Sequence, residues 1–245
     1  MKISDIGIIL SASEFQEKLI LIKIFSKNHG LISSVARKPS SKNKSSYQTG
    51  NIVSFQKFSR LPGQLGKVAC ELIESYQGDI IFNKLNLVSY NAISEIILNS
   101  FEEGDIHEKS YDMLYEYLKN LNNRNLFWKR YFLAELTILA EAGYGLELDE
   151  CAVNRTSENL RYVSPKTGKA VSEYAAKGYE HLLLKLPRFL INNSEPVNYE
   201  EIDCGLNLTN YFFTRYIWVH KKPESPINAR NSLKKIASEY FVNLI

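Results

Sequence analysis

Short apolar runs separated by turn residues fill the first 76 residues. They occupy positions 5–12, 17–26, 31–37, 51–60 and 67–76, and Gly30 can supply the positive φ of a tight turn. The pattern predicts five short strands and one longer, basic loop. Five such strands fit a small closed or partly open barrel of the OB type, and an SH3-like barrel fits the same pattern.

One of these runs alternates clearly. Across residues 51–60, Val53, Phe55 and Lys57 fall on one face, and Ile52, Ser54, Gln56 and Phe58 fall on the other. The aromatic residues of these strands are expected in the barrel core. They are Phe25, Phe55 and Phe58.

From Ser89 the apolar positions recur at helical spacing. Residues 89–104 and 107–123 each carry one apolar stripe, and residues 124–145 are apolar on two faces. The last of these helices should lie centrally and end at Gly143, a suitable C-cap. Further helices are predicted in three segments. They are 172–186, 199–220 and 225–241.

The change of period defines the organisation of the chain. We predict an α+β protein with an OB-fold domain at 1–80 and a helical domain at 81–245. Between residues 149 and 175 the helical pattern lapses into loop and possible hairpin, which marks an insertion in the helical domain.

Composition describes an ordinary folded protein. Charged residues make up 23% and apolar residues 44%, and no apolar run approaches the roughly 20 residues of a membrane helix. The N-terminal segment lacks the apolar core and cleavage site of a secretory signal. Three widely spaced cysteines suit a reducing compartment. We therefore expect a cytoplasmic protein.

Charge is distributed unevenly. Residues 1–67 hold eleven cations against three acids, a net charge of +8, whereas the remaining residues carry −5. Four of the eleven cations, Arg37, Lys38, Lys42 and Lys44, lie in residues 34–51 together with serines and a proline. That stretch could be a disordered connector or a polyanion-binding loop. The asymmetry indicates that the first domain faces an anionic ligand.

Motifs for catalysis are weak. The four histidines show no metal-binding spacing, and residues 165–172 fail the P-loop pattern because Val163 replaces its glycine and Ala170 its Ser or Thr. We therefore expect no enzyme. An unrecognised nuclease is the least supported alternative.

The insertion was a candidate zinc site, since a turn-rich segment between helices can hold a zinc knuckle. Zinc needs four thiolate or imidazole ligands, commonly as two CxxC pairs. Cys151 is followed by Asn154, and the second pair of positions holds Ser172 and Ala175. One thiolate is insufficient, so we predict neither metal nor cofactor.

Cations of the barrel predict binding to nucleic acid, because Lys and Arg that neutralise phosphates release counterions. Tyr47 is the aromatic residue expected to be most exposed and available for stacking on bases. Alternatively, these lysines only keep the domain soluble. The predicted DNA-binding residues are Lys18, Lys23, Arg37, Lys38, Lys42, Lys44, Tyr47, Lys57 and Arg60.

Three stretches resemble the bacterial RecO family of recombination mediators, over nearly the whole chain. They are residues 7–42, 127–154 and 160–172. The resemblance implies an OB fold followed by a helical domain, in a protein that binds single- and double-stranded DNA, anneals complementary strands and acts with RecR to load RecA on DNA covered by SSB. It also implies a four-cysteine zinc site, and of its positions 151, 154, 172 and 175 only Cys151 matches, leaving a degenerate zinc-knuckle-like insertion.

Family members also bind the acidic C-terminal tail of SSB through the helical domain. Lys129 and Arg130, on a largely apolar helix, are the predicted contact, although either could extend to solvent beside a core helix. The leading hypothesis is a non-enzymatic DNA-binding mediator. The alternative is an adaptor whose barrel binds an acidic protein and contacts DNA only indirectly.

Overall fold

The computed structural model describes residues 1–38, 44–61, 64–124, 126–192, 195–219 and 228–242. The first part is a closed five-stranded barrel with strand order β1-β2-β3-β5-β4, in which β3 and β5 run parallel. This order is that of an OB fold, so the predicted fold class is confirmed and the SH3-like alternative is set aside. Its strands are β1 (Lys2–Gln16), β2 (Leu19–Ser26), β3 (Gly30–Arg37), β4 (Ile52–Phe58) and β5 (Gly66–Glu74).

Every second side chain along the strands points into the barrel and fills its interior. Ile9, Ile24, Val53 and Phe55 point inward and form part of a core that is nearly closed to solvent. Since alternate side chains of a strand lie on opposite faces, the residues between them line the outside of the barrel. A short helix, η1 (Lys44–Tyr47), lies beside β5.

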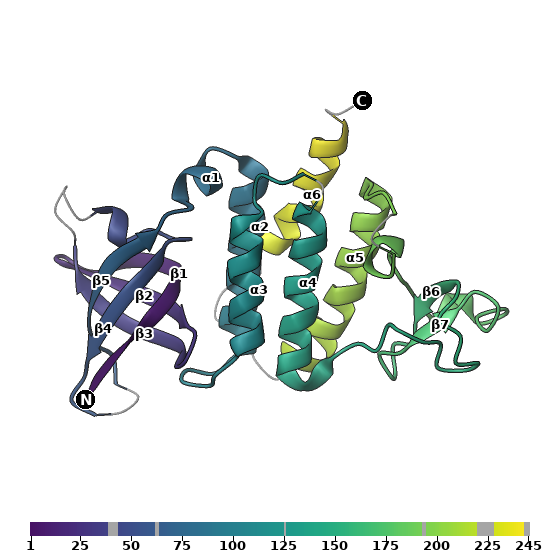
Figure 1. The fold of residues 1–245 in the computed structure, drawn as a ribbon, viewed down its shortest axis with the longest axis horizontal. Coiled ribbons are helices and arrows are strands. Elements are labelled where there is room, and N and C mark those ends of the chain that lie inside the picture. Colours follow the sequence, from purple (N-terminus) through teal and green to yellow (C-terminus); the bar gives the residue numbers. More distant parts are fainter. Residues whose placement is uncertain (39–43, 62–63, 125, 193–194, 220–227, 243–245) are drawn as a thin grey trace.

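Helices follow the barrel in the chain and lie beside it (Figure 1). The prediction that the longest helix ends at Gly143 is confirmed, because α4 continues through η2 (Ala140–Tyr144) to this residue, whose φ is +91°. The helices are α1 (Gln77–Ile81), α2 (Lys84–Ser100), α3 (Glu108–Lys119), α4 (Phe127–Leu139), α5 (Tyr199–Phe212), which continues into η5 (Phe213–Ile217), and α6 (Asn228–Val242). No helix in these described ranges is long and apolar enough to cross a membrane.

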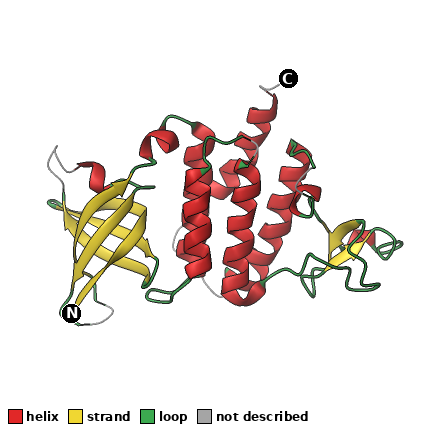
Figure 2. Cartoon of the chain, viewed as in Figure 1, coloured by secondary structure: helices red, strands yellow, loops and turns green. Residues whose placement is uncertain are grey.

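A small sheet stands at the far end of the molecule from the barrel (Figure 2). It is formed by β6 (Leu160–Val163), β7 (Ala170–Ser172) and β8 (Leu184–Lys185), in the order β7-β6-β8. The helix predicted at 172–186 is wrong: this segment consists of turns, η3 (Glu180–Leu182) and β8, and η4 (Arg188–Leu190) follows it. Gly178 has φ +84°, and Leu184 and Lys185 pair with β6 instead of continuing a helix.

Aromatic rings join the barrel to the helices. Phe25, on the outside of β2, lies 6.1 Å from Phe101 and 6.0 Å from Tyr111 between ring centroids, and His107 stacks on Phe101 at 3.6 Å. Gly30 allows close approach here, since a Cβ at this residue would lie 1.9 Å from the Asp105 carbonyl oxygen. Phe25 is buried, but the prediction that it lies in the barrel core is wrong, because it packs between the barrel and the helices.

A hydrogen-bonded tyrosine reinforces this joint. Tyr90 of α2 is fully buried, and its hydroxyl donates to the Ile9 carbonyl at 2.6 Å and accepts from the Gly50 N–H at 3.0 Å. Both partners belong to the barrel. The helix is thereby fixed to barrel backbone.

A buried ion pair connects the helices at their centre. The Arg230 guanidinium of α6 donates to both carboxylate oxygens of Glu135 on α4, at 2.9 and 3.2 Å. Tyr131 and Thr209 also donate to that carboxylate, and Arg230 donates to the Leu206 carbonyl. A charge pair without solvent needs such additional hydrogen bonds, and here they come from α4 and α5.

Candidate nucleic-acid interface

Beyond Phe25 and Leu31, which pack against the helices, the outer surface of β2 and β3 carries cations. The inward positions of these strands hold Ile22, Ile24 and Ile32, so Lys23 and Arg37 point outward. Lys23 pairs across the ladder with Ser33, and Arg37 is exposed at the end of β3. In OB folds this face and the loops that follow β1 and β4 bind oligonucleotides.

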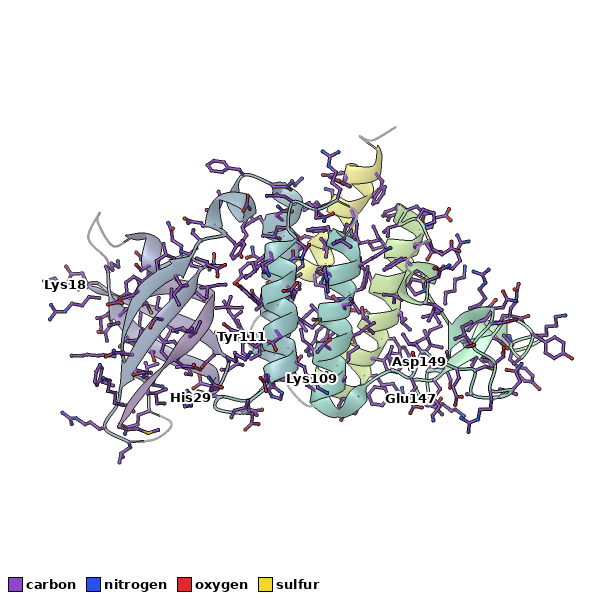
Figure 3. All side chains as sticks on the ribbon, viewed as in Figure 1. Lys18, His29, Lys109, Tyr111, Glu147 and Asp149 are labelled. Atoms are coloured by element: carbon purple, nitrogen blue, oxygen red, sulfur yellow. The ribbon has the colours of Figure 1, made fainter. Side chains whose placement is uncertain are left out.

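The two loops that border this face add further cations. Lys18 is exposed in the turn between β1 and β2 and lies on the side of the barrel away from the helices (Figure 3). Arg60 is exposed just after β4. Lys38 is exposed as well, but its ammonium donates to Glu14 at 2.8 Å, and this bond holds the pKa of the Glu14 carboxyl below its usual value. The charge of Lys38 is therefore partly compensated.

The centre of the predicted basic loop is not covered by the structure. Lys42 lies outside the described residues, and for Lys44 only the backbone, as the first residue of η1, is described. Their proposed contacts with phosphate stay predictions.

The position of Lys57 corrects one expectation. Lys57 follows the inward phase of Val53 and Phe55, is only 7% exposed, and donates from its ammonium to the Ser33 carbonyl at 3.0 Å. Burial lowers the pKa of this ammonium. The structure thus places Lys57 within the barrel, apart from the outer cations.

The aromatic expectations also need correction. Tyr47 is only half-exposed: it packs against the barrel core, and its hydroxyl accepts from the Cys70 N–H at 3.5 Å. Phe55 is buried as predicted, but Phe58 is 49% exposed and lies outside the core. Tyr47 is held inward because η1 lies beside β5, whereas Phe58 occupies an outward position of β4.

Two outward lysines were missed as site candidates. Lys67, the second residue of β5, lies beside Val35 of β3, and Lys2 begins β1; both lysines are exposed. The signal that could have found them is strand alternation, since both occupy outward positions of their strands.

In the helical domain, Lys129 and Arg130 are half-buried on α4. A cavity of about 210 Å³ lies at the start of the same helix, where Phe127 and Trp128 form part of its wall. The cation that lines this cavity is Arg124, which the sequence did not indicate. The structure brings Lys129 and Arg130 to the helix but not into the lining of this cavity.

The four zinc-knuckle positions do come together, but as hydrogen-bond partners. The Cys151 thiol accepts from the N–H groups of Val153 and Ser172 at 3.4 and 3.3 Å, and Ser172 Oγ lies 3.4 Å from both Asn154 Nδ2 and the Ala175 N–H. Burial raises the pKa of the thiol, but hydrogen bonds that include these backbone donors outweigh burial and lower it to about 7. One sulfur with an amide and a hydroxyl does not fit zinc. Among the described residues, no group of three or more His, Cys, Asp or Glu could hold a metal.

Comparison with known proteins gives the family. The model for the recombination protein O N terminus matches residues 1–76, and the model for its C terminus matches residues 85–223. The chain belongs to the RecO family. RecO relatives named DNA repair protein RecO include that of Rickettsia bellii (strain OSU 85-389), 41% identical over 225 residues, which are 91% of this chain and 93% of the relative. That of Rickettsia typhi is 39% identical over 244 residues, covering 100% of both.

Membership in RecO agrees with the architecture of this chain. The two matched segments correspond to the barrel and to most of the helical part, and a role in recombination repair follows from the family. DNA binding also follows from RecO membership.

Proposed function

We propose that this RecO protein is a non-enzymatic mediator that binds single- and double-stranded DNA along the outer wall of its barrel and anneals complementary strands. The observation that carries the proposal is a group of exposed or half-exposed cations on β2, β3, the start of β5 and the loops after β1 and β4, of which Lys18 lies on the side of the barrel away from the helices. Within the proposed domains, 1–80 would hold DNA and 81–245 would bind partners. The group consists of Lys18, Lys23, Arg37, Arg60 and Lys67.

Annealing needs no covalent step. Two strands of phosphate repel each other, and a cationic surface that neutralises phosphates lowers that repulsion while it releases counterions. A wall that presents several lysines and arginines to solvent can therefore hold two strands near each other. Lys42 and Lys44 would extend this surface.

The partners follow from the family role. In this proposal the protein acts with RecR to load RecA on strands covered by SSB, and the helical domain binds the acidic, apolar tail of SSB. Two features support a tail-binding surface: half-buried Lys129 and Arg130 on an apolar helix, and the cavity beside α4 with Arg124 in its lining.

Salt dependence of DNA binding tests the proposal. If about four phosphates are neutralised, the affinity for an oligonucleotide should fall by roughly two orders of magnitude between 50 and 200 mM salt. A variant with Lys18, Lys23 and Arg37 changed to Ala should bind more weakly, and its plot of log affinity against log salt should be less steep by about 2. Fluorescence anisotropy with labelled single strands measures both.

The matched control changes three exposed lysines at the opposite end of the molecule, Lys166, Lys177 and Lys185, to Ala. This variant loses the same charge. If DNA binds specifically to the outer wall of the barrel, its affinity for the oligonucleotide and its salt slope should stay close to those of the wild type. Equal losses in both triple variants would show that only net charge matters and would contradict the proposed interface.

A further inference from the structure

Phe58 stands on the outside of the barrel between two lysines. It is the last residue of β4, and its partners across the two neighbouring ladders are Lys2 of β1 and Lys67 of β5. Directly paired residues project from the same face of a sheet, so the three side chains form one outward row. The ring is 49% exposed, while both lysines are exposed.

This ring is not needed for the barrel core. The interior is filled by Phe55 and aliphatic residues of all five strands, and Phe58, at an outward position, is not part of that core. Lys2 places its ammonium 5.6 Å from the ring centroid, within the range of a cation–π contact. A large apolar ring is thus held at the surface beside positive charge.

The position of β5 keeps this row together. A Cβ on Gly66 would lie 2.3 Å from the Phe58 carbonyl oxygen, so only glycine permits β5 to begin this close to the end of β4. Lys67, the next residue, is thereby set directly opposite Phe58. Because Gly66 has no side chain, the Phe58 ring and Lys67 can lie side by side across the two strands.

The row is also free of acids. The next outward row on the same strands consists of Ser4, Gln56 and Ala69, and the first acid on this part of the wall is Glu71, one row further on, opposite Ser54. On its other side the row continues from Lys67 to Val35 of β3 and Leu21 of β2, which lie between Lys23 and Arg37. Phe58 is therefore continuous with the proposed interface.

We infer that Phe58 is a stacking platform for an unpaired base of a single-stranded nucleic acid, with Lys2 and Lys67 on the phosphates that flank this base. The inference rests on the proposed function and adds a preference within it. An exposed aromatic face can stack on any base without sequence selectivity, whereas the faces of bases inside a duplex are already covered by their neighbours. The platform therefore favours single strands over duplex.

Replacing Phe58 by Leu tests the platform, because leucine keeps an apolar side chain but removes the π face. Binding of a labelled oligo(dT) should weaken roughly 5- to 150-fold, the effect of one lost stacking contact. Binding of a blunt duplex should stay unchanged, and so should the salt dependence, since no charge is removed. Phe82→Leu is the matched control, because Phe82 is 92% exposed but lies beyond the barrel, between α1 and α2.

Phe58→Trp supplies a direct spectroscopic readout. This variant should keep its affinity for oligo(dT), and its fluorescence, corrected for the signal of native Trp128 and Trp218, should be quenched when a base stacks on the indole. The same substitution at Phe82 should show no quenching.

The outcomes separate the inference from the function on which it rests. Wild-type affinity of Phe58→Leu for oligo(dT), or equal losses on single strand and duplex, would overturn the platform while DNA binding stands. Failure of the wild-type protein to bind either form of DNA would overturn the proposed function itself.

Discussion

The barrel has two outer walls that differ in chemistry although they are built from the same strands. Toward the helices it presents Ile8, Leu10, Phe25, Leu31 and Ile52, all buried in a core shared with the helical domain. Toward solvent it presents lysines, Arg37 and the exposed ring of Phe58. A closed barrel thus supports a permanent apolar contact and a charged surface at the same time.

The difference indicates that packing against the helices and the proposed DNA binding are separable. β2 contributes to both walls, because Phe25 packs against the helices whereas Lys23, two residues earlier, is half-exposed to solvent. Apolar burial supplies stability, whereas exposed charge supplies little of it and acts mainly on association. Substitutions on one wall should therefore leave the function of the other intact.

The largest effect is expected from Phe25→Ala. It removes a fully buried ring and its contacts with Phe101 and Tyr111, and should lower the free energy of unfolding by about 3–5 kcal/mol. Urea denaturation measures the change. Lys23→Ala on the free wall should change stability by no more than about 0.5 kcal/mol. Similar losses in the two variants would contradict the division into walls.

A smaller effect is expected from Tyr90→Phe. The ring stays in place, but the hydroxyl that bonds the Ile9 carbonyl and the Gly50 N–H is lost, which should cost about 1 kcal/mol. The loss is limited because Gly50 N–H also donates directly to the Ile9 carbonyl at 2.9 Å. Denaturation midpoints report the change, and unaltered oligonucleotide affinity of the folded variant would support the separation. A change in affinity larger than that in stability would contradict it.

The smallest effect is the pH dependence that His107 gives to the joint. Burial lowers the pKa of His107 below its ordinary value of 6.5, although Glu141 and Asp105 oppose the shift. The unfolded chain then binds the proton more readily, so stability is complete above pH 6.5 and declines as the pH falls below it. In His107→Gln this decline should be reduced between pH 7 and the range in which carboxylates titrate. An unchanged pH profile would exclude His107 as its source.

The periodicity of apolar residues predicted those structural features that depend on residues close together in the chain. The alternation through Val53, Phe55 and Lys57 gave the barrel, and Gly143 gave the end of a helix, because each follows from local backbone chemistry. Phe58 was wrongly expected in the core although it falls on the face opposite Phe55, and its exposure depends on which outer wall the helices cover. That choice is made by contacts between distant segments, such as Phe25 with Phe101.

The structural features that the sequence did not predict depend on contacts between residues far apart in the chain. Tyr47 was expected at the surface, yet it is held by a bond to Cys70 on β5. The segment 172–186 has apolar residues at helical spacing, but Leu184 and Lys185 pair with a strand that precedes them by some twenty residues. Nothing in local sequence indicates that Arg230 meets Glu135, which lies 95 positions earlier.

That ion pair imposes an order on folding during synthesis. Glu135 is completely buried, and its positive partner is on α6, near the end of the described chain. Until Arg230 has left the ribosome, α4 carries a carboxylate that cannot be buried without a large penalty, so the packing of α4 against α5 stays incomplete. The barrel has no such dependence for its internal core, whose residues all precede position 71. The nascent chain can therefore complete the barrel while the helical end is still being made.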